Sequence, residues 1–347
     1  MNKNILMLVA AIVSSAFTGA CTAPVADSGE EIGESESEVR VMNGSRLTGV
    51  ALAGANVNGA SLDGVRFTGM QLNGLALKDV ALHGTVLSGT LESGVVLSGA
   101  DLIGATMTGV LTDGSEVMLR IDNVVTTADA DILNYSISSV GSRGASVPVC
   151  GFDASGTEVM SFPLAGRYDQ SVGTATGGSF IADATQFSLA CKGAALAKCA
   201  ELGYKPFKTV SECNSLGQCQ DVSLAPVHQA CVRMIRADYC GDGASHTFTG
   251  TEIDVFDALR IRNEDSTVPG SIEAEWGVDG AQCVLHPRWV SATYGDVQQY
   301  METHCPGRYN PQSPVCARAT STFNTDVGYS VPMDERALLR NRSEIRQ

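Results

Sequence analysis

Residues 55–74 read ANVNGASLDGVRFTGMQLNG, and a large apolar residue recurs at every fifth position of this stretch. The spacing continues over residues 47–107, interrupted only at Glu92, and glycine stands two positions after each of these residues except at Asp79. A period of five matches neither the 3.6 residues of a helical turn nor the two-residue repeat of a strand. It predicts a β-solenoid over residues 46–114, with apolar side chains stacked inward and glycine easing each corner.

The repeat resembles the pentapeptide-repeat family, whose A-(D/N)-L-x-x units build a right-handed quadrilateral β-helix. The residue before each apolar position departs from that pattern, as at Ser61, Arg66 and Gln71. Some members of the family imitate DNA with an acidic surface, but residues 46–114 carry only five acidic against three basic residues. Because a duplex carries one negative charge per about 1.7 Å, this segment is expected to be a rigid spacer or an interaction surface.

The N-terminus predicts export. Residues 1–20 have the charge and the short apolar run of a signal peptide, and the run is too short to span a bilayer. Thr18-Gly19-Ala20-Cys21 resembles a lipoprotein cleavage site, although Thr18 replaces the usual leucine. The alternative is ordinary cleavage after Ala20. Lipidation of Cys21 is favoured because it leaves ten cysteines, an even number.

Residues 21–45 are predicted to form a lipidated acidic tether, because their like charges and low hydropathy favour an extended chain. The expected partner is therefore a membrane, reached through the N-terminal lipid, and Thr22 favours the outer membrane. Two or three acyl chains hold a protein stably on a bilayer.

Residues 115–347 are predicted to form a disulfide-rich α+β domain. Strands are expected at 117–125, 132–140, 158–164, 178–191, 246–255 and 272–285. Helices are expected at 193–202, 224–239 and 294–305.

Several motifs in this part resemble the ADYC domain, found mainly in myxobacterial secreted proteins and lipoproteins. They are GAALAKC at 193–199, LGYKPF at 202–207, HQACVRM at 228–234, RADYCGDG at 236–243 and EAEWG at 273–277. The family has no assigned activity, so the resemblance implies architecture and location but no chemistry.

The ten cysteines after Cys21 are expected to form five disulfides in an exported protein. Their short loops favour the pairs Cys213–Cys219 and Cys305–Cys316. The alternative is a metal site that uses Cys231 and Cys240 with His228 and His246. The CxxC spacing of zinc sites is absent, so no metal is predicted. The cysteines concerned are Cys150, Cys191, Cys199, Cys213, Cys219, Cys231, Cys240, Cys283, Cys305 and Cys316.

The reactive groups that could form a catalytic centre are concentrated between residues 228 and 257. His246 and Asp238 would make a chemically reasonable acid–base pair, with His228 nearby, but no nucleophile motif accompanies them. The structural alternative is that His228 packs near a disulfide and that Asp242-Gly243 forms an ordinary turn. Calcium is disfavoured because the acidic residues of this region lack EF-hand spacing; they are Asp238, Asp242, Glu252, Asp254 and Asp257. Trp276 is expected in the core or at its rim.

The net charge of −15 and the absence of a basic cluster exclude a nucleic-acid partner. The sequence predicts an exported, lipid-anchored cell-envelope protein with a binding or structural role and no cofactor. An envelope protein or polysaccharide is the expected ligand. The competing hypothesis is an extracytoplasmic hydrolase that uses the region of His228, Asp238 and His246.

Overall fold

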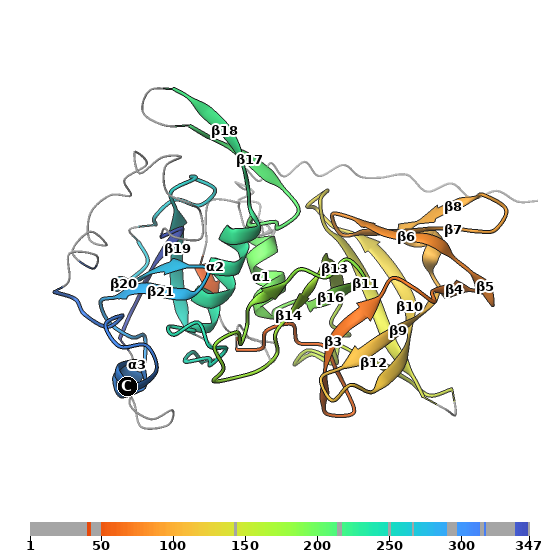
Figure 1. The fold of residues 1–347 in the computed structure, drawn as a ribbon, viewed down its shortest axis with the longest axis horizontal. Coiled ribbons are helices and arrows are strands. Elements are labelled where there is room, and N and C mark those ends of the chain that lie inside the picture. Colours follow the sequence, from red (N-terminus) through yellow and green to blue (C-terminus); the bar gives the residue numbers. More distant parts are fainter. Residues whose placement is uncertain are drawn as a thin grey trace, which may run out of the picture. The chain divides into compact units, whose positions relative to one another are not determined.

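The computed structural model describes residues 40–42, 50–141, 144–213, 217–248, 251–265, 267–289, 297–312, 316 and 337–345. Within them the chain forms a closed β-barrel, a separate five-stranded sheet and helices that pack on both (Figure 1). The two parts have their own hydrophobic cores.

Six antiparallel strands close the barrel in the order β3-β16-β13-β11-β10-β9, and β9 pairs back with β3. Two of them come from the five-residue repeat and four from the chain after it. Their bounds are β3 Ala60–Arg66, β9 Thr106–Leu111, β10 Glu116–Thr126, β11 Leu133–Val140, β13 Ser161–Ala165 and β16 Gln186–Cys191. The predicted boundary at 114/115 falls inside the β9–β10 hairpin, so both segments share one barrel.

The barrel interior is filled by side chains. Tyr135 and Phe187 are fully buried there, and a Cβ atom on Gly109 would lie 2.8 Å from Leu62 and 2.9 Å from Leu119. The interior of a barrel with so few strands is wide enough only for the side chains of the barrel itself. Leu87 is buried in the same core. Its backbone N–H donates to the Tyr135 hydroxyl at 3.1 Å, which ties β7 (Val86–Thr90) to the barrel.

The five-residue repeat does not form the expected quadrilateral β-helix. Its described residues pair as antiparallel hairpins, whereas successive coils of a β-helix run parallel. The inward phase of the apolar residues was predicted correctly, since Val57, Leu62, Leu77, Leu87 and Leu102 are buried. The remaining elements of this part are β2 Asn56–Val57, β4 Gln71–Leu72, β5 Leu75–Ala76, β6 Lys78–His83, β7 Val86–Thr90, β8 Val96–Ser98 and the 3-10 helix η1 Gly99–Leu102.

Two Asn-Gly pairs explain why the repeat folds back on itself. Asn58 and Gly59 connect β2 to β3 with φ of 52° and 90°, and Asn73 and Gly74 connect β4 to β5 with φ of 52° and 78°. Positive φ at both central residues is the mark of the tight hairpin turn that matches strand twist, and Asn-Gly is its preferred sequence. The period of five placed the apolar residues, but these turns set the strand direction.

Gly59→Ala is expected to lower the free energy of unfolding by about 1–2 kcal/mol, because φ of +90° is strained for a residue with a side chain. Nothing lies within 4 Å of the added Cβ, so only backbone strain contributes. Gly141→Ala is the matched control, since its φ is not in the left-handed region and its nearest neighbour is 3.5 Å away. Equal losses for both variants, measured by urea denaturation, would contradict this turn geometry.

The second sheet is antiparallel and has the order β1-β19-β22-β20-β21. Its central strand, β22, comes from the C-terminal end of the chain, a strand that the sequence did not predict. The bounds are β1 Arg40–Met42, β19 Glu252–Asp257, β20 Ser271–Gly277, β21 Gly280–Val284 and β22 Leu339–Ser343.

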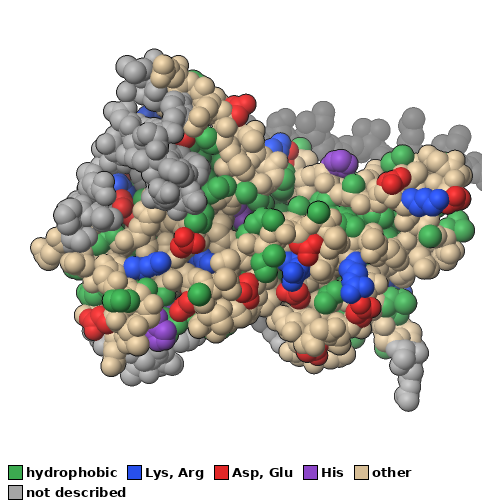
Figure 2. All heavy atoms as spheres, viewed as in Figure 1, with side chains coloured by type: hydrophobic (Ala, Val, Ile, Leu, Met, Phe, Trp, Pro, Cys, Tyr) green, Lys and Arg blue, Asp and Glu red, His purple; other side chains and the backbone are tan. Residues whose placement is uncertain are grey.

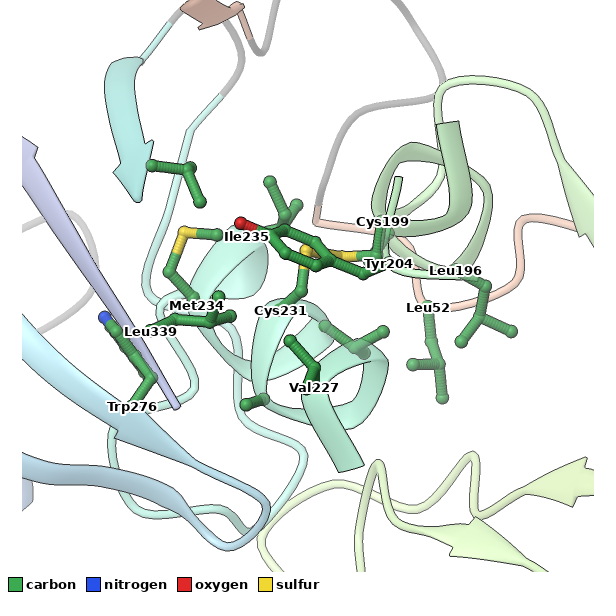
Figure 3. Close-up of a cluster of buried hydrophobic side chains, with 14 of the residues drawn as sticks. Leu52, Leu196, Cys199, Tyr204, Val227, Cys231, Met234, Ile235, Trp276 and Leu339 are labelled. Carbon is green, nitrogen blue, oxygen red and sulfur yellow. A yellow bond between two sulfur atoms is a disulfide. The ribbon is translucent and has the colours of Figure 1, made fainter. Parts of the chain in front are cut away.

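Helix α2 (Ala225–Arg236) packs on this sheet and also against α1 (Ala195–Glu201), which contacts barrel strand β16. The buried Cys199–Cys231 disulfide joins the two helices inside the cluster drawn in Figure 3. Helix α2 ends three residues earlier than expected because Ala237 adopts a left-handed conformation, with φ of 52° and ψ of 41°. The third helix, α3, spans Val297–His304 as predicted, within a few residues.

The smaller elements are paired locally. A two-stranded hairpin, β17 with β18, projects from the body in Figure 1 and is closed by a disulfide at its tip. Strand β12 pairs with barrel strand β11, and β14 pairs with β15. The bounds of these smaller strands are β12 Ser146–Pro148, β14 Arg167–Tyr168, β15 Phe180–Ile181, β17 Thr209–Cys213 and β18 Cys219–Ser223. Among the residues that the structure describes, no helix has the length and apolar character needed to cross a membrane.

The ten cysteines after Cys21 form five disulfides, as expected for an exported protein. The predicted pair Cys213–Cys219 is correct. The predicted pair Cys305–Cys316 is wrong, because tertiary contacts bring Cys305 to Cys240 after α2 and Cys316 to Cys283 of β21. The bonds are Cys150–Cys191, Cys199–Cys231, Cys213–Cys219, Cys240–Cys305 and Cys283–Cys316.

Candidate functional site

Asp238 holds the chain where it leaves α2. The left-handed Ala237 turns the backbone so that Asp238 lies beside Arg233 of the last helical turn, with 2.6 Å between Oδ2 and Nη1. The same carboxylate accepts the backbone N–H groups of Asp242 and Gly243, each at 3.0 Å. Burial raises the pKa of Asp238, and the charge of Arg233 opposes that rise. The acid that the sequence suggested for catalysis is therefore engaged in an ion pair and a turn.

The glycines beside Asp242 allow close backbone contact. A Cβ atom on Gly241 would lie 2.0 Å from the carbonyl oxygen of Asp279, and one on Gly243 would lie 2.3 Å from that of Ser171. Both glycines also have positive φ. This turn is therefore packed against two other loops, and no side chain can replace either hydrogen without moving backbone.

Tyr239 lies at the centre of a buried polar network. Its hydroxyl donates to Glu273 at 2.9 Å and accepts the backbone N–H of Arg288 at 3.0 Å. Arg288 forms an ion pair with Glu273 at 2.9 Å, and Asn341 donates to the second Glu273 oxygen at 2.6 Å. Burial alone would raise the pKa of Glu273, but Arg288 outweighs it and holds that pKa below its usual value.

The network continues through the aromatic core. Trp276 stacks on Tyr239 with 5.4 Å between ring centroids and donates its indole N–H to Asn341 at 2.7 Å. It is fully buried, which confirms the expected core position. The Glu273–Gly277 motif thus supplies a hydrogen-bond acceptor, Glu273, and a stacking partner, Trp276, to Tyr239 of the Ala237–Cys240 motif.

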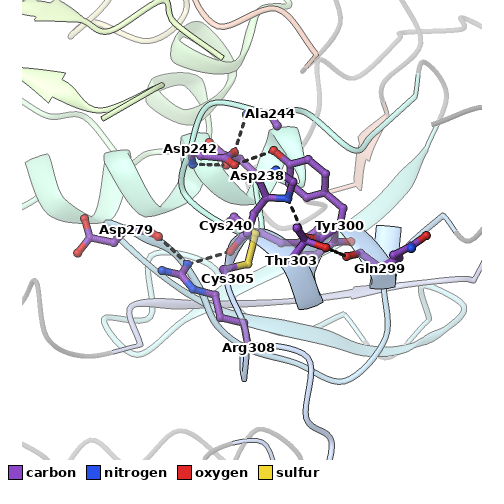
Figure 4. Close-up of a disulfide and its surroundings, with 12 residues drawn as sticks. Asp238, Cys240, Asp242, Ala244, Asp279, Gln299, Tyr300, Thr303, Cys305 and Arg308 are labelled. Atoms are coloured by element: carbon purple, nitrogen blue, oxygen red, sulfur yellow. Dashed lines mark hydrogen bonds between the residues drawn. A yellow bond between two sulfur atoms is a disulfide. The ribbon is translucent and has the colours of Figure 1, made fainter. Parts of the chain in front are cut away.

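The Cys240–Cys305 disulfide ties this turn to α3 (Figure 4). From α3, the Tyr300 hydroxyl donates to Asp242 Oδ2 at 2.7 Å. Arg308, just after the disulfide, donates to the backbone carbonyls of Tyr239 at 2.8 Å and Asp279 at 2.6 Å. In the sequence Ala-Asp-Tyr-Cys, Ala237 therefore makes the turn, and Asp238, Tyr239 and Cys240 each have a defined partner.

His228 is a buried link between α2, α1 and β14. Its Nε2 lies 3.0 Å from the Leu196 carbonyl oxygen, so Nε2 carries the hydrogen, and Nδ1 accepts the Tyr168 hydroxyl at 3.2 Å. Burial lowers the pKa of His228 to about 4. The imidazole is neutral at pH 7, and both nitrogens are used by the fold.

His246 occupies a different position, between the rings of Tyr239 and Tyr300, whose centroids lie 6.0 and 4.5 Å away. It is 5% exposed, and neither ring nitrogen has a hydrogen-bond partner among the described residues. Burial lowers its pKa to about 4, while the nearby carboxylate of Asp242 opposes the shift. The predicted acid–base pair is not formed, because Asp238 bonds to Arg233 and His246 packs between aromatic rings.

The alternative metal site is also not assembled, because Cys231 and Cys240 belong to separate disulfides. Across the described residues, no three His, Cys, Asp or Glu side chains are placed to hold an ion. The acids considered for calcium have other partners: Asp257 accepts the Tyr204 hydroxyl at 2.9 Å, and Asp254 accepts the backbone N–H of Asp265 at 3.0 Å.

Sequence reasoning did not identify Arg233, Arg288 and Tyr300 as members of this region. The available signal was the pair of arginines, Arg233 and Arg236, which flank the apolar residues Met234 and Ile235 at the end of α2. A buried arginine requires a charged or carbonyl partner, so such a helix predicts an acidic residue near its end.

Replacing each of the two histidines by phenylalanine should change the free energy of unfolding by different amounts. His246→Phe is expected to change the free energy of unfolding at pH 7 by less than about 1 kcal/mol, because an unbonded ring is replaced by an apolar one. His228→Phe is expected to cost about 2–4 kcal/mol, because Tyr168 and the Leu196 carbonyl lose their partner. Urea denaturation at pH 7 measures both.

Acid should unfold the protein partly through these histidines. Each has an ordinary pKa of 6.5 and a folded pKa of about 4, so the unfolded chain binds more protons between those values. Stability therefore falls as pH falls through this window, by up to about 3 kcal/mol per histidine. His246→Phe should flatten the profile, and an unchanged profile would contradict the buried neutral His246.

Cys21, the signal peptide and residues 22–39 and 43–45 of the predicted tether lie outside the described residues. Their predicted roles therefore remain predictions from the sequence. Residues 40–42 do not belong to a free tether, because they form strand β1 and pair with β19.

Comparison with known families agrees with the motifs. The ADYC domain model matches residues 99–290, more than half of the chain. The family model described as pentapeptide repeats (8 copies) matches two stretches of the chain, residues 41–74 and 77–111. Searches of curated proteins and of solved structures gave no match. The ADYC match begins within the repeat and crosses residue 114, in agreement with a barrel built from both segments. The chain therefore belongs to the ADYC-domain family, with a pentapeptide-repeat segment at its N-terminal side.

Proposed function

We propose that this chain is an exported, lipid-anchored cell-envelope protein whose role is binding or structural. The five disulfides support an extracytoplasmic location, because such bonds persist in oxidising compartments. The lipid anchor at Cys21 and the outer membrane are part of the proposal and rest on the sequence alone.

The observation that carries a non-catalytic role is the use of the candidate acid–base residues by the fold. Asp238 pairs with Arg233 and accepts hydrogen bonds from two backbone N–H groups, and both ring nitrogens of His228 form hydrogen bonds. A general base needs a free lone pair within reach of a substrate proton. Asp238 and His228 are buried, at 1% and 0% exposed, so a substrate proton does not reach them, and His246 is buried between two tyrosines.

The expected ligand is an envelope protein or a polysaccharide. On the face shown in Figure 2, basic side chains are scattered among acidic ones, without the continuous basic stripe that nucleic acids require. The net charge of −15 also favours partners other than polyanions. The barrel, with its filled interior, would serve as a rigid body that presents its outer surface.

Metabolic labelling with a fatty acid in a bacterial host that lipidates exported proteins tests the anchor. The unaltered chain and Thr18→Leu, which restores the usual residue of the cleavage site, are expected to carry label and to sediment with membranes. Cys21→Ser is expected to lose the label and to appear in the soluble exported fraction with its disulfides intact. Equal labelling of the Cys21→Ser protein, or none in any of the three, would overturn the proposal.

A further inference from the structure

The C-terminal strand β22 fills a slot in the middle of the second sheet. It pairs antiparallel with β19 on one side and with β20 on the other, so without it both neighbours would have an unpaired edge. Leu339 and Asn341 are completely buried in the slot. Gly270 borders it closely, because a Cβ atom there would lie 2.1 Å from the carbonyl oxygen of Ser343.

The slot recognises the side chains of β22 as well as its backbone. Glu275 accepts two hydrogen bonds from the Arg340 guanidinium, at 2.7 and 2.9 Å, in a pair that is about 5% exposed. Glu273 and Trp276 bond to the two ends of the Asn341 amide. Backbone pairing gives affinity in strand addition, and pockets for alternate side chains give specificity. The slot therefore has the properties of a specific strand-binding site.

The covalent path to β22 is long. Cys316 is fixed to Cys283 of β21 by a disulfide, and twenty residues, 317–336, separate it from the described segment that carries β22. Twenty residues reach at most about 70 Å, which exceeds the roughly 50 Å diameter of a globular body of this size. The connection is long enough for β22 of one molecule to enter the slot of another.

We propose that the slot between β19 and β20 accepts the C-terminal strand of a second copy of this chain, which gives a reciprocally exchanged dimer. Each slot in such a dimer keeps every contact seen here, so exchange requires no new interface and is opposed mainly by the entropy of association. The pairing of Glu275 with Arg340 selects this strand over other extended segments, because a wrong residue would leave a buried carboxylate unpaired.

Charge reversal tests the exchange. The variants Glu275→Arg and Arg340→Glu each place two like charges in the slot, so each alone is expected to be destabilised. The two full-length proteins are mixed in guanidinium with their disulfides intact and refolded together. Exchange pairs each altered residue with its complement, so the mixture should contain a heterodimer by light scattering, with a Tm close to that of the unaltered chain. A mixture that holds only the two destabilised monomers would overturn the proposal.

A pair of cysteine variants tests the same exchange if the charge-reversal variants do not fold. Ile272 and Arg342 are cross-strand partners at a half-buried position of the same slot. Proteins with Ile272→Cys and Arg342→Cys, mixed in the same way, should give a disulfide-linked heterodimer as the main product. Mixing Ile272→Cys with Ile345→Cys, whose cysteine is exposed beyond the strand, is the control. Equal cross-linking in both mixtures, or none in either, would contradict strand exchange.

Discussion

Arg288→Met is expected to lower the free energy of unfolding by about 3–5 kcal/mol, the usual cost of leaving a buried charge without its partner. Arg288 and Glu273 are both inaccessible to solvent and lie 2.9 Å apart. The variant also removes the donors to the carbonyls of Met234 and Ile235 at the end of α2. Chemical denaturation monitored by tryptophan fluorescence measures the loss, because Trp276 belongs to the same network.

Two further proteins make this prediction specific. Arg66→Met breaks an exposed pair with Glu116 and should cost less than about 1 kcal/mol. Adding Glu273→Gln to Arg288→Met removes the unpaired carboxylate and should restore a large part of the lost stability. If the double variant is as unstable as the sum of the two single variants, Glu273 and Arg288 do not act as a pair.

Asp238→Ala is expected to lower the free energy of unfolding by about 3–5 kcal/mol as well. The change leaves the Arg233 guanidinium buried without its carboxylate and removes the acceptor for the N–H groups of Asp242 and Gly243. A catalytic acid would behave differently, because its removal abolishes turnover and leaves folding intact.

Asp279→Ala is the matched control, since this carboxylate is exposed in the loop that packs on the same turn. Its free energy of unfolding should stay within about 0.5 kcal/mol of the unaltered value. If Asp238→Ala is as stable as Asp279→Ala, the buried ion pair does not hold the turn, and a functional role for Asp238 becomes the better explanation.

The repeat shows which parts of the fold the sequence could predict. Its period placed Leu62, Leu87 and Leu102 in the core correctly, because burial follows the apolar pattern directly. The strand direction depended on Asn58-Gly59 and Asn73-Gly74, which the five-residue period conceals because glycine occurs in nearly every unit. The asparagine before the glycine in these two units therefore makes the chain form hairpins of a barrel instead of coils of a β-helix.

The sequence directed attention to residues 228–257, but it did not show which partners their polar side chains would have. His228, Asp238 and His246 are close in sequence, but each has its own neighbours in the fold. His228 bonds to Tyr168 and the Leu196 carbonyl, Asp238 pairs with Arg233, and His246 packs between two tyrosine rings. The partners of Asp238 and Tyr239, namely Arg233 and Glu273, are charged residues in apolar surroundings. Polar residues at the end of an apolar helix predicted a site, whereas only their partners distinguish a catalytic group from a structural one.

The central strand and the disulfide pairing could not be predicted for a related reason. Leu339–Ser343 is too short and too polar for a strand pattern, and it is buried because Glu273, Glu275 and Trp276 supply partners. Cys305 and Cys316 are neighbours in sequence, but Cys305 bonds to Cys240 in the turn after α2 and Cys316 bonds to Cys283 of β21. Both features depend on contacts between distant segments.

The most direct test of an exported, lipid-anchored protein held by disulfides is the intact mass of the membrane-purified chain, unreduced and treated with a thiol-alkylating reagent. The account predicts the mass of a chain that begins at Cys21 with two or three acyl groups, no alkylated cysteine and five disulfides. An unacylated chain, or two or more alkylated cysteines, would contradict it.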